Sequence, residues 1–193
     1  MQKFVLLLLS MGLISQLSGC VPLAVVGVGA GIAVVGSDSR TSAIYLDDKE
    51  IELRAANRIS VLYPASLVHA NTNSFNRAVL LTGQVPDEKA RQRVEEVVRA
   101  VPDVAKVYNQ LQIGKPTDLS TRSNDVYLDA AVQSRLIRAG TVPISGVKVV
   151  TENGVVYLMG SLTPEQANIA TTIARNTQGV SSVVTLFEQH QAE

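Results

Sequence analysis

The sequence lacks tryptophan and has few of the other residues that build sites for bases or metals. Its 193 residues include three phenylalanines, five tyrosines, two histidines and one cysteine. The scarcity of aromatic rings disfavours base stacking. The balance of 17 basic and 17 acidic residues disfavours nucleic-acid binding, which usually needs a basic excess on one face. So few histidines and cysteines leave little for metal coordination, and a single cysteine excludes an internal disulfide. We therefore expect no metal, no cofactor and no nucleic-acid partner.

Hydrophobic residues make up 46% of the chain, which is enough for a globular core, but they are unevenly distributed. Residues 1–36 carry one charge, at Lys3, whereas the chain from Asp38 onward has the mixed composition of a soluble domain. The first 36 residues therefore need an explanation of their own.

The N-terminus has the order of a secretory signal. A short positive segment ends at Lys3, and the apolar run 4–14 that follows is too short to cross a hydrocarbon core of ~30 Å as a helix. The next residues, Leu17-Ser18-Gly19-Cys20, resemble the lipobox of bacterial lipoproteins. The resemblance implies a signal peptide over residues 1–19, cleavage before Cys20 and acylation of the Cys20 thiol. The alternative is a buried cysteine in an uncleaved signal anchor.

The residues after Cys20 bear on where the anchor lies. In enteric-type bacteria an aspartate at the next position retains a lipoprotein in the inner membrane, and Val21 stands there instead. The resemblance therefore implies the periplasmic face of the outer membrane. Stable anchoring needs more than one acyl chain, a condition that a three-acyl lipoprotein meets. We expect residues 20–45 to be the lipidated N-terminus and a membrane-proximal tether. The alternatives are a short second transmembrane helix and, at Gly27–Gly31, a dinucleotide-binding loop.

The rest of the chain contains one pattern twice. Val79–Gly83 matches Val156–Gly160, 77 residues later, and Ile51 matches Leu128 at the same offset. Internal repetition of this length indicates two copies of a small domain. Glycine and proline interrupt regular structure between them. We place the copies at residues 46–113 and 122–188, with a linker at 114–121 and a tail at 189–193.

Each copy is predicted to run helix, strand, strand, helix, strand. The first helix of copy one is predicted at 48–59, with Asp47 and Asp48 near its N-terminus, where negative charge complements the helix dipole. Alternating and helical spacings then predict strands at 67–74 and 77–85, a helix that Pro86-Asp87-Glu88 opens, and a strand at 103–113.

In copy two we expect Asn124 to cap a first helix that runs to about Ala139. The dipeptide Asn153-Gly154 is a strong hairpin signal between strands predicted at 147–152 and 155–160. Thr163 and Pro164 suit the cap and first position of a second helix. Gly179 is expected to end that helix in a left-handed cap, before a strand at 180–187.

This αββαβ order, with a glycine in the second strand, resembles the BON domain of bacterial osmotic-shock and outer-membrane proteins. The most specific stretch is residues 149–160. Two copies behind a lipobox resemble the dual BON-domain outer-membrane lipoproteins, a family associated with lipid binding, division and outer-membrane stress. The resemblance implies an α+β fold of two tandem domains, each a small three-stranded sheet with two helices on one face.

No set of nucleophile, base and orienting acid stands out in the sequence. His69 lies in a predicted strand and His190 in the tail, and neither has a cysteine partner once Cys20 is acylated. We interpret His69 as a solvated strand residue, and Gly83 and Gly160 as places where another backbone approaches closely or the strand has a bulge. We therefore expect no catalytic residues and no enzyme activity.

The first helices of the two copies differ on the face opposite the predicted core. At 100° per residue, copy one is predicted to bury Ile51, Ala55, Ile59 and Leu62. Its opposite face is polar apart from Leu53. Copy two is predicted to bury Leu128, Val132, Leu136 and Ala139. Its opposite face, however, carries Tyr127, Ala130, Ser134, Ile137 and Arg138. A second apolar stripe on a surface helix indicates a partner.

The composition of this stripe favours a membrane. A tyrosine has an apolar ring and a polar tip that suit the membrane interface, and each basic residue near an anionic lipid surface contributes roughly 1 kcal/mol. The family resemblance implies a lipid-binding surface on this helix, which carries over to Tyr127, Arg135, Ile137 and Arg138. The alternative is that the stripe packs on copy one.

We therefore expect a non-enzymatic outer-membrane lipoprotein whose second BON domain binds anionic phospholipid, such as phosphatidylglycerol. Its expected role is to support envelope integrity, at division sites or strained membrane. The alternative is a periplasmic adaptor that binds envelope-assembly or peptidoglycan enzymes through sheet edges or the same helix face.

Overall fold

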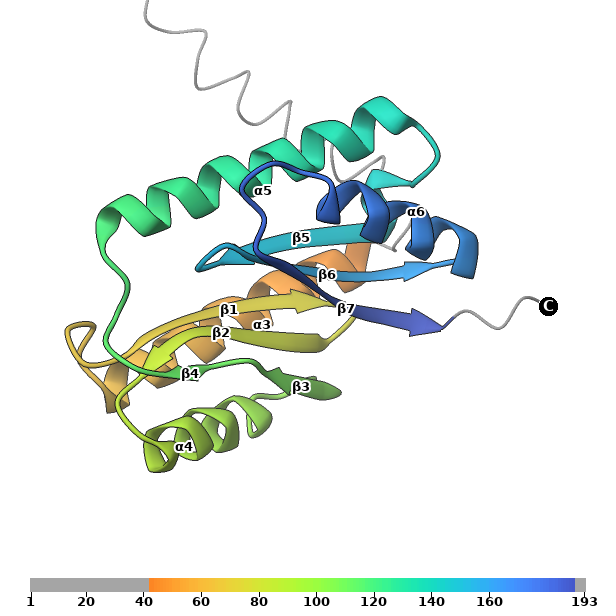
Figure 1. The fold of residues 1–193 in the computed structure, drawn as a ribbon. Coiled ribbons are helices and arrows are strands. Elements are labelled where there is room, and N and C mark those ends of the chain that lie inside the picture. The colour runs from red at the N-terminus through yellow and green to blue at the C-terminus, as the bar shows by residue number, and fades with distance from the viewer. Residues whose placement is uncertain (1–41, 190–193) are drawn as a thin grey trace, which may run out of the picture. The chain divides into compact units, whose positions relative to one another are not determined.

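Two αββαβ units make up residues 42–189, the part of the chain that the computed structural model describes. The central strand of the first unit, β2, pairs antiparallel with β1 and parallel with both β3 and β4 (Figure 1). The elements of this unit are α3 (Ser42–Leu62), β1 (His69–Phe75), β2 (Ala78–Val85), α4 (Glu88–Arg99), β3 (Lys106–Asn109) and β4 (Gln112–Ile113).

The second unit repeats this topology around β6, which pairs antiparallel with β5 and parallel with β7. Its elements are α5 (Leu119–Ala139), the short 3-10 helix η2 (Ile144–Gly146), β5 (Val147–Glu152), β6 (Val155–Leu162), α6 (Pro164–Arg175) and β7 (Ser182–Gln189). The predicted α+β fold of two tandem copies is confirmed.

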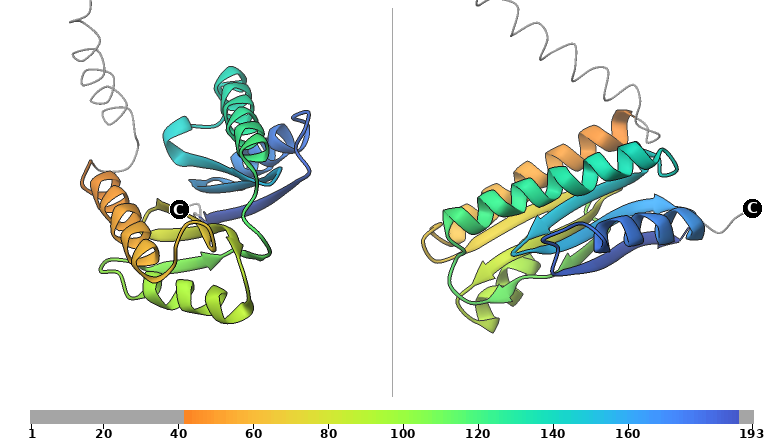
Figure 2. Two further views of the ribbon diagram at one scale, coloured as in Figure 1. Left: turned by 90° about the vertical axis from the view of Figure 1, so that its left-hand side faces the viewer. Right: turned by 45° about the horizontal axis from the view of Figure 1, so that its top comes forward.

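In each unit the two helices pack on one face of the sheet, as the views in Figure 2 show. Side chains alternate along a strand, so Val79, Leu81 and Val85 of β2 point into the first core. The first core also takes Ile51, Ala55 and Ile59 from α3 and Ala90, Val94 and Val98 from α4. The second core is built in the same way from α5, α6 and β6.

The other faces of the two sheets pack against each other. Leu80 and Ala78 of β2, on the side opposite the first core, meet Val150, Tyr157 and Met159 of the second unit, and all of these side chains are buried. The two units therefore share a third apolar cluster that neither could form alone.

Both first helices begin six residues before their predicted starts. Helix α5 is capped by Asp118, whose carboxylate accepts the N–H of Thr121 at 2.8 Å, so the prediction of Asn124 as the cap was wrong. Helix α3 begins at Ser42, so Asp47 and Asp48 lie inside the helix and do not complement its N-terminal dipole.

The last strand of the first unit is interrupted. The side chain of Asn109 accepts the N–H of Leu111 at 3.2 Å, and the Leu111 side chain is buried in the first core. This turn of the chain separates β3 from β4. At the N-terminus of α4, Asp87 is the cap, and Pro86 precedes the helix instead of opening it.

Three other local predictions were also wrong. Gly179 has a φ of +93° but lies beyond the end of α6, so it is part of the connection to β7 and not a helix cap. Leu62 and Ala139, in the last turns of α3 and α5, are exposed, because the helix ends run past the sheets that they cover.

Several turn and cap predictions are confirmed. Asn153 and Gly154 have φ values of +51° and +75° and form the two-residue turn between β5 and β6. Thr163 caps α6, with Pro164 in the first turn. A Cβ on Gly160 would lie 2.4 Å from the backbone oxygen of Gly146 in η2, which is one of the two situations expected there, a close backbone approach.

Candidate lipid-binding surface

A buried aspartate fixes α5 to the hairpin of its own unit. Oδ1 of Asp125 accepts the N–H of Gly154, and Oδ2 accepts the N–H of Asn153, both at 2.8 Å. The two N–H groups belong to the turn residues, which have no partner in the strand ladder. This contact sets the rotation of α5 on its sheet and therefore decides which side chains face solvent.

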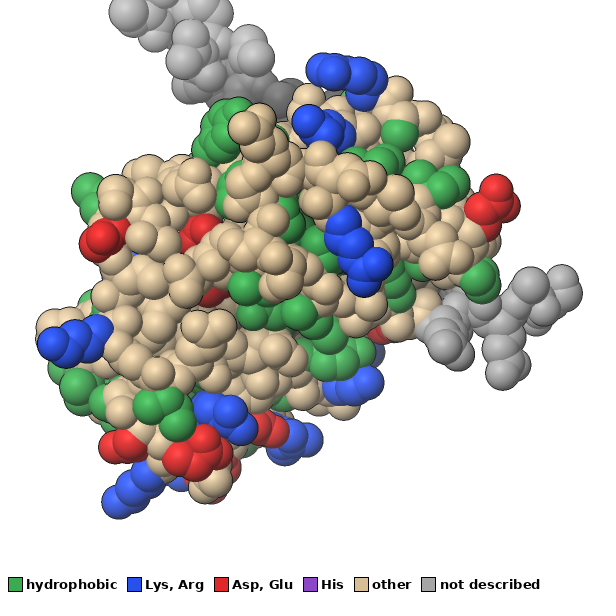
Figure 3. Space-filling view, viewed as in Figure 1, with side chains coloured by type: hydrophobic (Ala, Val, Ile, Leu, Met, Phe, Trp, Pro, Cys, Tyr) green, Lys and Arg blue, Asp and Glu red, His purple; other side chains and the backbone are tan. Residues whose placement is uncertain are grey.

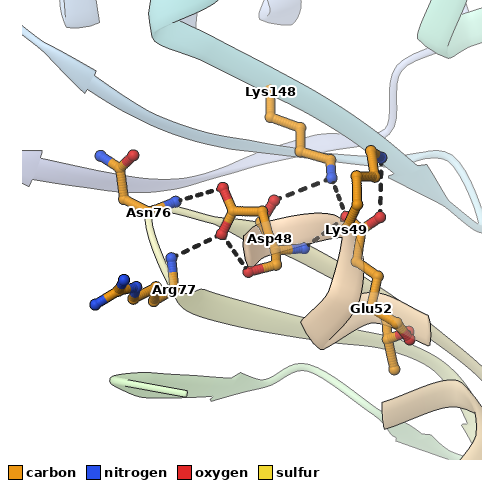
Figure 4. Close-up of polar contacts among 8 residues, drawn as sticks. Asp48, Lys49, Glu52, Asn76, Arg77 and Lys148 are labelled. Carbon is orange, nitrogen blue, oxygen red and sulfur yellow. Dashed lines mark hydrogen bonds and ion pairs between the residues drawn. The ribbon is translucent and has the colours of Figure 1, made fainter. Parts of the chain in front are cut away.

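The first unit contains the same contact. Asp48 accepts the N–H groups of Asn76 and Arg77 at 2.9 and 2.8 Å, as Figure 4 shows. The aspartate and the turn of the first unit both recur 77 residues later, as Asp125 and the turn Asn153-Gly154. Sequence reasoning missed this pair of contacts, although the shared offset of aspartate and turn could have indicated them.

The rotation of α5 exposes a line of apolar side chains. Leu119, Val126 and Ile137 are 79%, 71% and 59% exposed. With Ala130 they follow spacings of seven, four and seven residues, which place them in one line along a helix. Sequence reasoning missed Leu119 because this residue lay outside the predicted helix. It also missed Val126, which lies inside the predicted helix, seven residues after Leu119.

Tyr127 is also exposed, but it lies about 100° around the helix from Val126. Arg138 is exposed in the last turn of α5, close to Tyr127 in angular position. Figure 3 shows hydrophobic and basic side chains along the upper edge of the view, where α5 lies. Tyr127, Ile137 and Arg138 therefore share the solvent side of one helix.

Arg135 has a different environment from the other three predicted residues. Its Nη1 donates to the backbone carbonyl of Asn176 at 3.1 Å, at the C-terminal end of α6. Arg135 thus links the ends of the two helices, and its side chain points to the edge of the exposed surface.

The two units contact each other away from the apolar line of α5. Lys148 of β5 forms an ion pair with Glu52 of α3 and also donates to the carbonyl of Ser74 at 3.1 Å (Figure 4). Burial alone would raise the pKa of Glu52, but the charge and hydrogen bond of Lys148 bring it below its ordinary value. Gln84 donates to the buried Glu152 at 2.9 Å. The predicted alternative, in which the α5 stripe packs on copy one, does not match this arrangement.

Helix α3 is less polar than predicted on its outer face. Leu46 and Val61 are exposed in addition to Leu53. Both lie outside the predicted helix 48–59, so the longer helix adds them to its surface. The difference between the two first helices is therefore smaller than the sequence analysis proposed.

His69 is not a solvated strand residue. Its side chain is 19% exposed, and Nε2 lies 3.9 Å from a carboxylate oxygen of Glu152. Burial lowers the pKa of His69, against the opposing charge of Glu152.

Residues 42–189 contain no cluster of three or more histidine, cysteine, aspartate and glutamate side chains that could hold a metal ion. Within that same part of the chain, no helix has the length and apolar character needed to cross a bilayer. Cys20, the predicted signal peptide at residues 1–19 and His190 lie outside the described residues.

Comparisons with known proteins identify the repeated unit. The BON domain model matches residues 65–115 and 124–190. The chain is 35% identical over 173 residues to "Outer membrane lipoprotein DolP" of Haemophilus influenzae, and the match covers 89% of each chain. It is 32% identical over 157 residues to the "21 kDa hemolysin" of Actinobacillus pleuropneumoniae, which covers 80% of each.

A solved structure of CdsD, a structural protein of the type III secretion system of Chlamydia trachomatis, is more distant. The match covers 72% of this chain and 93% of the CdsD chain, at 13% identity and a TM-score of 0.29.

These relatives confirm the resemblance drawn from the sequence and the predicted localisation at the outer membrane. They also point to a non-catalytic protein of the cell envelope. The chain belongs to the BON-domain family and is a lipid-anchored outer-membrane protein of the dual-BON, DolP-like type.

Proposed function

We propose that this lipoprotein binds anionic phospholipid, such as phosphatidylglycerol, through α5 of its second BON domain, and that it supports envelope integrity, including at division sites. One observation carries the proposal: the side of α5 opposite its core presents an apolar line together with Tyr127 and Arg138. We propose no catalytic role for the protein.

The geometry of the line suits a helix that lies in the plane of the membrane interface. Leu119 and Ile137 are 18 positions apart, which corresponds to about 27 Å along a helix. Apolar side chains along that length can enter the boundary between headgroups and acyl chains while basic residues contact anionic lipid. Tyr127 would place its ring at the headgroup level.

The proposal includes an anchor at Cys20, with residues 20–45 as the lipidated N-terminus and tether. BON domains at 46–113 and 122–188, a linker at 114–121 and a tail at 189–193 complete the proposed organisation. Tethering to the same membrane raises the effective concentration of lipid at α5. A weak contact of this helix is then sufficient for function.

Vesicle binding by a fragment that begins at Asp38 tests the proposal, because that fragment lacks the anchor and contains every described element. We expect co-sedimentation with phosphatidylglycerol vesicles, weaker binding to phosphatidylcholine vesicles, and a loss of at least fivefold in binding for Ile137→Glu. Leu53→Glu on α3 is the matched control, because Leu53 is also an exposed apolar residue, at 73% against 59% for Ile137. Equal binding by Ile137→Glu and the parent fragment would refute the assignment of α5.

A second candidate function is that of a periplasmic adaptor. A cavity of about 380 Å³ between α3 and α4 combines the apolar Val61, Leu62 and Val97 with two arginines and one glutamate, Arg58, Arg93 and Glu96. Glu96 pairs with Arg93 at 2.7 Å, so Arg58 is the basic group that would meet an acidic protein segment. This candidate predicts recovery of one envelope protein from detergent-solubilised membranes, with recovery lost for Val61→Glu and kept for Ile137→Glu.

A further inference from the structure

A cavity of about 350 Å³ lies where β1 of the first unit meets α5 and β5 of the second. The first unit lines it with a histidine and two asparagines, whereas the second unit supplies the acidic and basic side chains and the apolar Val126, Val149 and Val150. The charged and polar lining residues are His69, Asn71, Asn73, Arg122, Asp125, Asp129, Thr151 and Glu152.

Three carboxylates line this cavity, and two of them have both oxygens occupied. Asp125 accepts the two turn N–H groups of its hairpin. Glu152 accepts the amides of Gln84 and Asn71, each at 2.9 Å. The third, Asp129, accepts the Gln133 amide on Oδ2 at 2.9 Å. Its buried Oδ1 has no well-aligned hydrogen bond among the described residues, and the hydroxyl of Thr151 is the neutral donor that faces this carboxylate.

The internal repeat shows which group belongs beside Asp129. At an offset of 77 residues, Asp129 corresponds to Glu52 and Asn71 corresponds to Lys148. Glu52 is neutralised by the Lys148 ammonium, which comes from the other unit. The equivalent lysine is missing in the second half of the repeat, since asparagine stands at position 71. Asp129 is thus a half-buried carboxylate without the ammonium that its counterpart has.

We propose that this cavity binds a primary alkylammonium group, which pairs with Asp129 as Lys148 pairs with Glu52. The group is either that of a small free amine or that of a lysine side chain from a partner protein. A quaternary ammonium is excluded because it has no N–H to donate to Oδ1. The proposal does not depend on lipid binding by α5. Asp129 is not one of the residues assigned to lipid, although Val126 borders both the apolar line and the cavity.

The protonation of Asp129 sets the pH dependence of this site. Burial raises the pKa of Asp129 to about 6, and the hydrogen bonds from Gln133 and Thr151 and the charge of Lys148 offset only part of that effect. The carboxylate is therefore charged above pH 6 and loses its charge below it, so ammonium binding decreases as the pH falls through 6. The other charged or titratable groups that face it are Lys148, Arg122, His69, Asp125 and Glu152.

The test is an NMR titration of the full-length protein in amine-free detergent micelles with n-butylammonium, which has the length of a lysine side chain. We expect saturable shifts of the Gln133 and Asn71 side-chain amides at pH 7.5. Binding should weaken at least tenfold for Asp129→Asn and at pH 5. Butyltrimethylammonium and n-butanol are matched controls that should leave these signals unchanged.

A second variant keeps the test decisive if Asp129→Asn perturbs the fold. Asn71→Lys supplies the missing ammonium from the chain itself, so it should fold and should abolish n-butylammonium binding. Glu165→Gln, which neutralises an exposed carboxylate on α6, is the control for a general charge effect.

Tighter binding of N-acetyl-lysine methylamide than of n-butylammonium would support a protein lysine as the natural group, and equal binding would support a free amine. Shifts that persist unchanged in both Asp129→Asn and Asn71→Lys would overturn the proposal.

Discussion

Asp125 lies 77 residues after Asp48, and each carboxylate accepts the two turn N–H groups of the hairpin in its own unit. Both side chains are buried, so neither contact can be replaced by water without rearrangement. In each unit the aspartate occupies the second turn of its first helix, so the contact fixes the N-terminal part of that helix to the hairpin.

The first prediction concerns this contact. Asp125→Ala leaves two buried N–H groups unpaired, and an unsatisfied buried polar group costs about 1 to 3 kcal/mol. We expect the free energy of unfolding, measured with urea, to fall by on the order of 2 kcal/mol or more. Asp118→Ala is a suitable control, because it removes only an exposed helix cap worth about 1 kcal/mol. An equal loss in both variants would contradict the role given to Asp125.

The second prediction concerns the ion pair between the units. Glu52→Gln leaves the Lys148 ammonium without its carboxylate and should destabilise the protein by about 1 to 3 kcal/mol. Because the pKa of Glu52 is lowered in the folded state from an ordinary value of 4.5, the pair stabilises the fold above pH 4.5. That stability is lost as the pH falls through the lowered pKa.

Unfolding measured from pH 7 to pH 3 checks the sign of this effect. The difference between the parent protein and Glu52→Gln should shrink at low pH, since the glutamate is then protonated. The double variant Glu52→Gln with Lys148→Met should recover part of the loss, because the unpaired charge is removed. A difference that stays constant with pH would show that the pair contributes nothing through its charge.

The third prediction concerns strand β6. Gly160→Val places a branched side chain where a Cβ would already lie 2.4 Å from the backbone oxygen of Gly146. We expect the substitution to accelerate hydrogen exchange, relative to the parent protein, more in β5 and β6 than in β1 and β2. Gly114→Ala is the control, since no atom lies within 4 Å of a Cβ there. Equal acceleration in both sheets would indicate that the shared apolar cluster makes the two units unfold together.

Much of the fold could be predicted because the repeat and its turn residues are local signals. Asn153-Gly154 and Thr163-Pro164 act through their own backbone conformation, and the structure places them as expected. The starts of α3 and α5 could not be found in this way. Asp118 and Asn124 are both favoured cap residues, so local preference does not choose between them for α5. The contacts of Asp48 and Asp125 with hairpins later in the chain are tertiary and leave no local signal.

The candidate site was predictable only in part for the same reason. Tyr127, Ile137 and Arg138 follow from the angular positions on a helix of the correct type. Leu119 and Val126 belong to the same surface, but their exposure depends on the true helix start and on the rotation set by Asp125. The cavity beside Asp129 involves both units and leaves no signal in either copy read alone.

The fourth prediction concerns the proposed anchor. Cys20→Ser removes the thiol that would accept the diacylglyceryl group, so the protein should keep its signal peptide and lose its acyl chains. Intact-mass analysis of the purified membrane form checks both points. An unmodified N-terminus that begins at Cys20 in the parent protein would contradict the anchor.

The last prediction separates the two arginines of α5. Arg138 is exposed near Tyr127, whereas Arg135 donates to the carbonyl of Asn176 at 3.1 Å. For the fragment from Asp38, Arg138→Ala should weaken binding to phosphatidylglycerol vesicles several-fold at 20 mM salt, because a basic residue near anionic lipid contributes about 1 kcal/mol. The loss should shrink at physiological ionic strength, where exposed charges are screened over about 8 Å. Arg135→Ala should change binding less and instead speed hydrogen exchange at the end of α6. If Arg135→Ala weakened binding more than Arg138→Ala at both salt concentrations, the basic contact with lipid would have to be moved to the edge between α5 and α6.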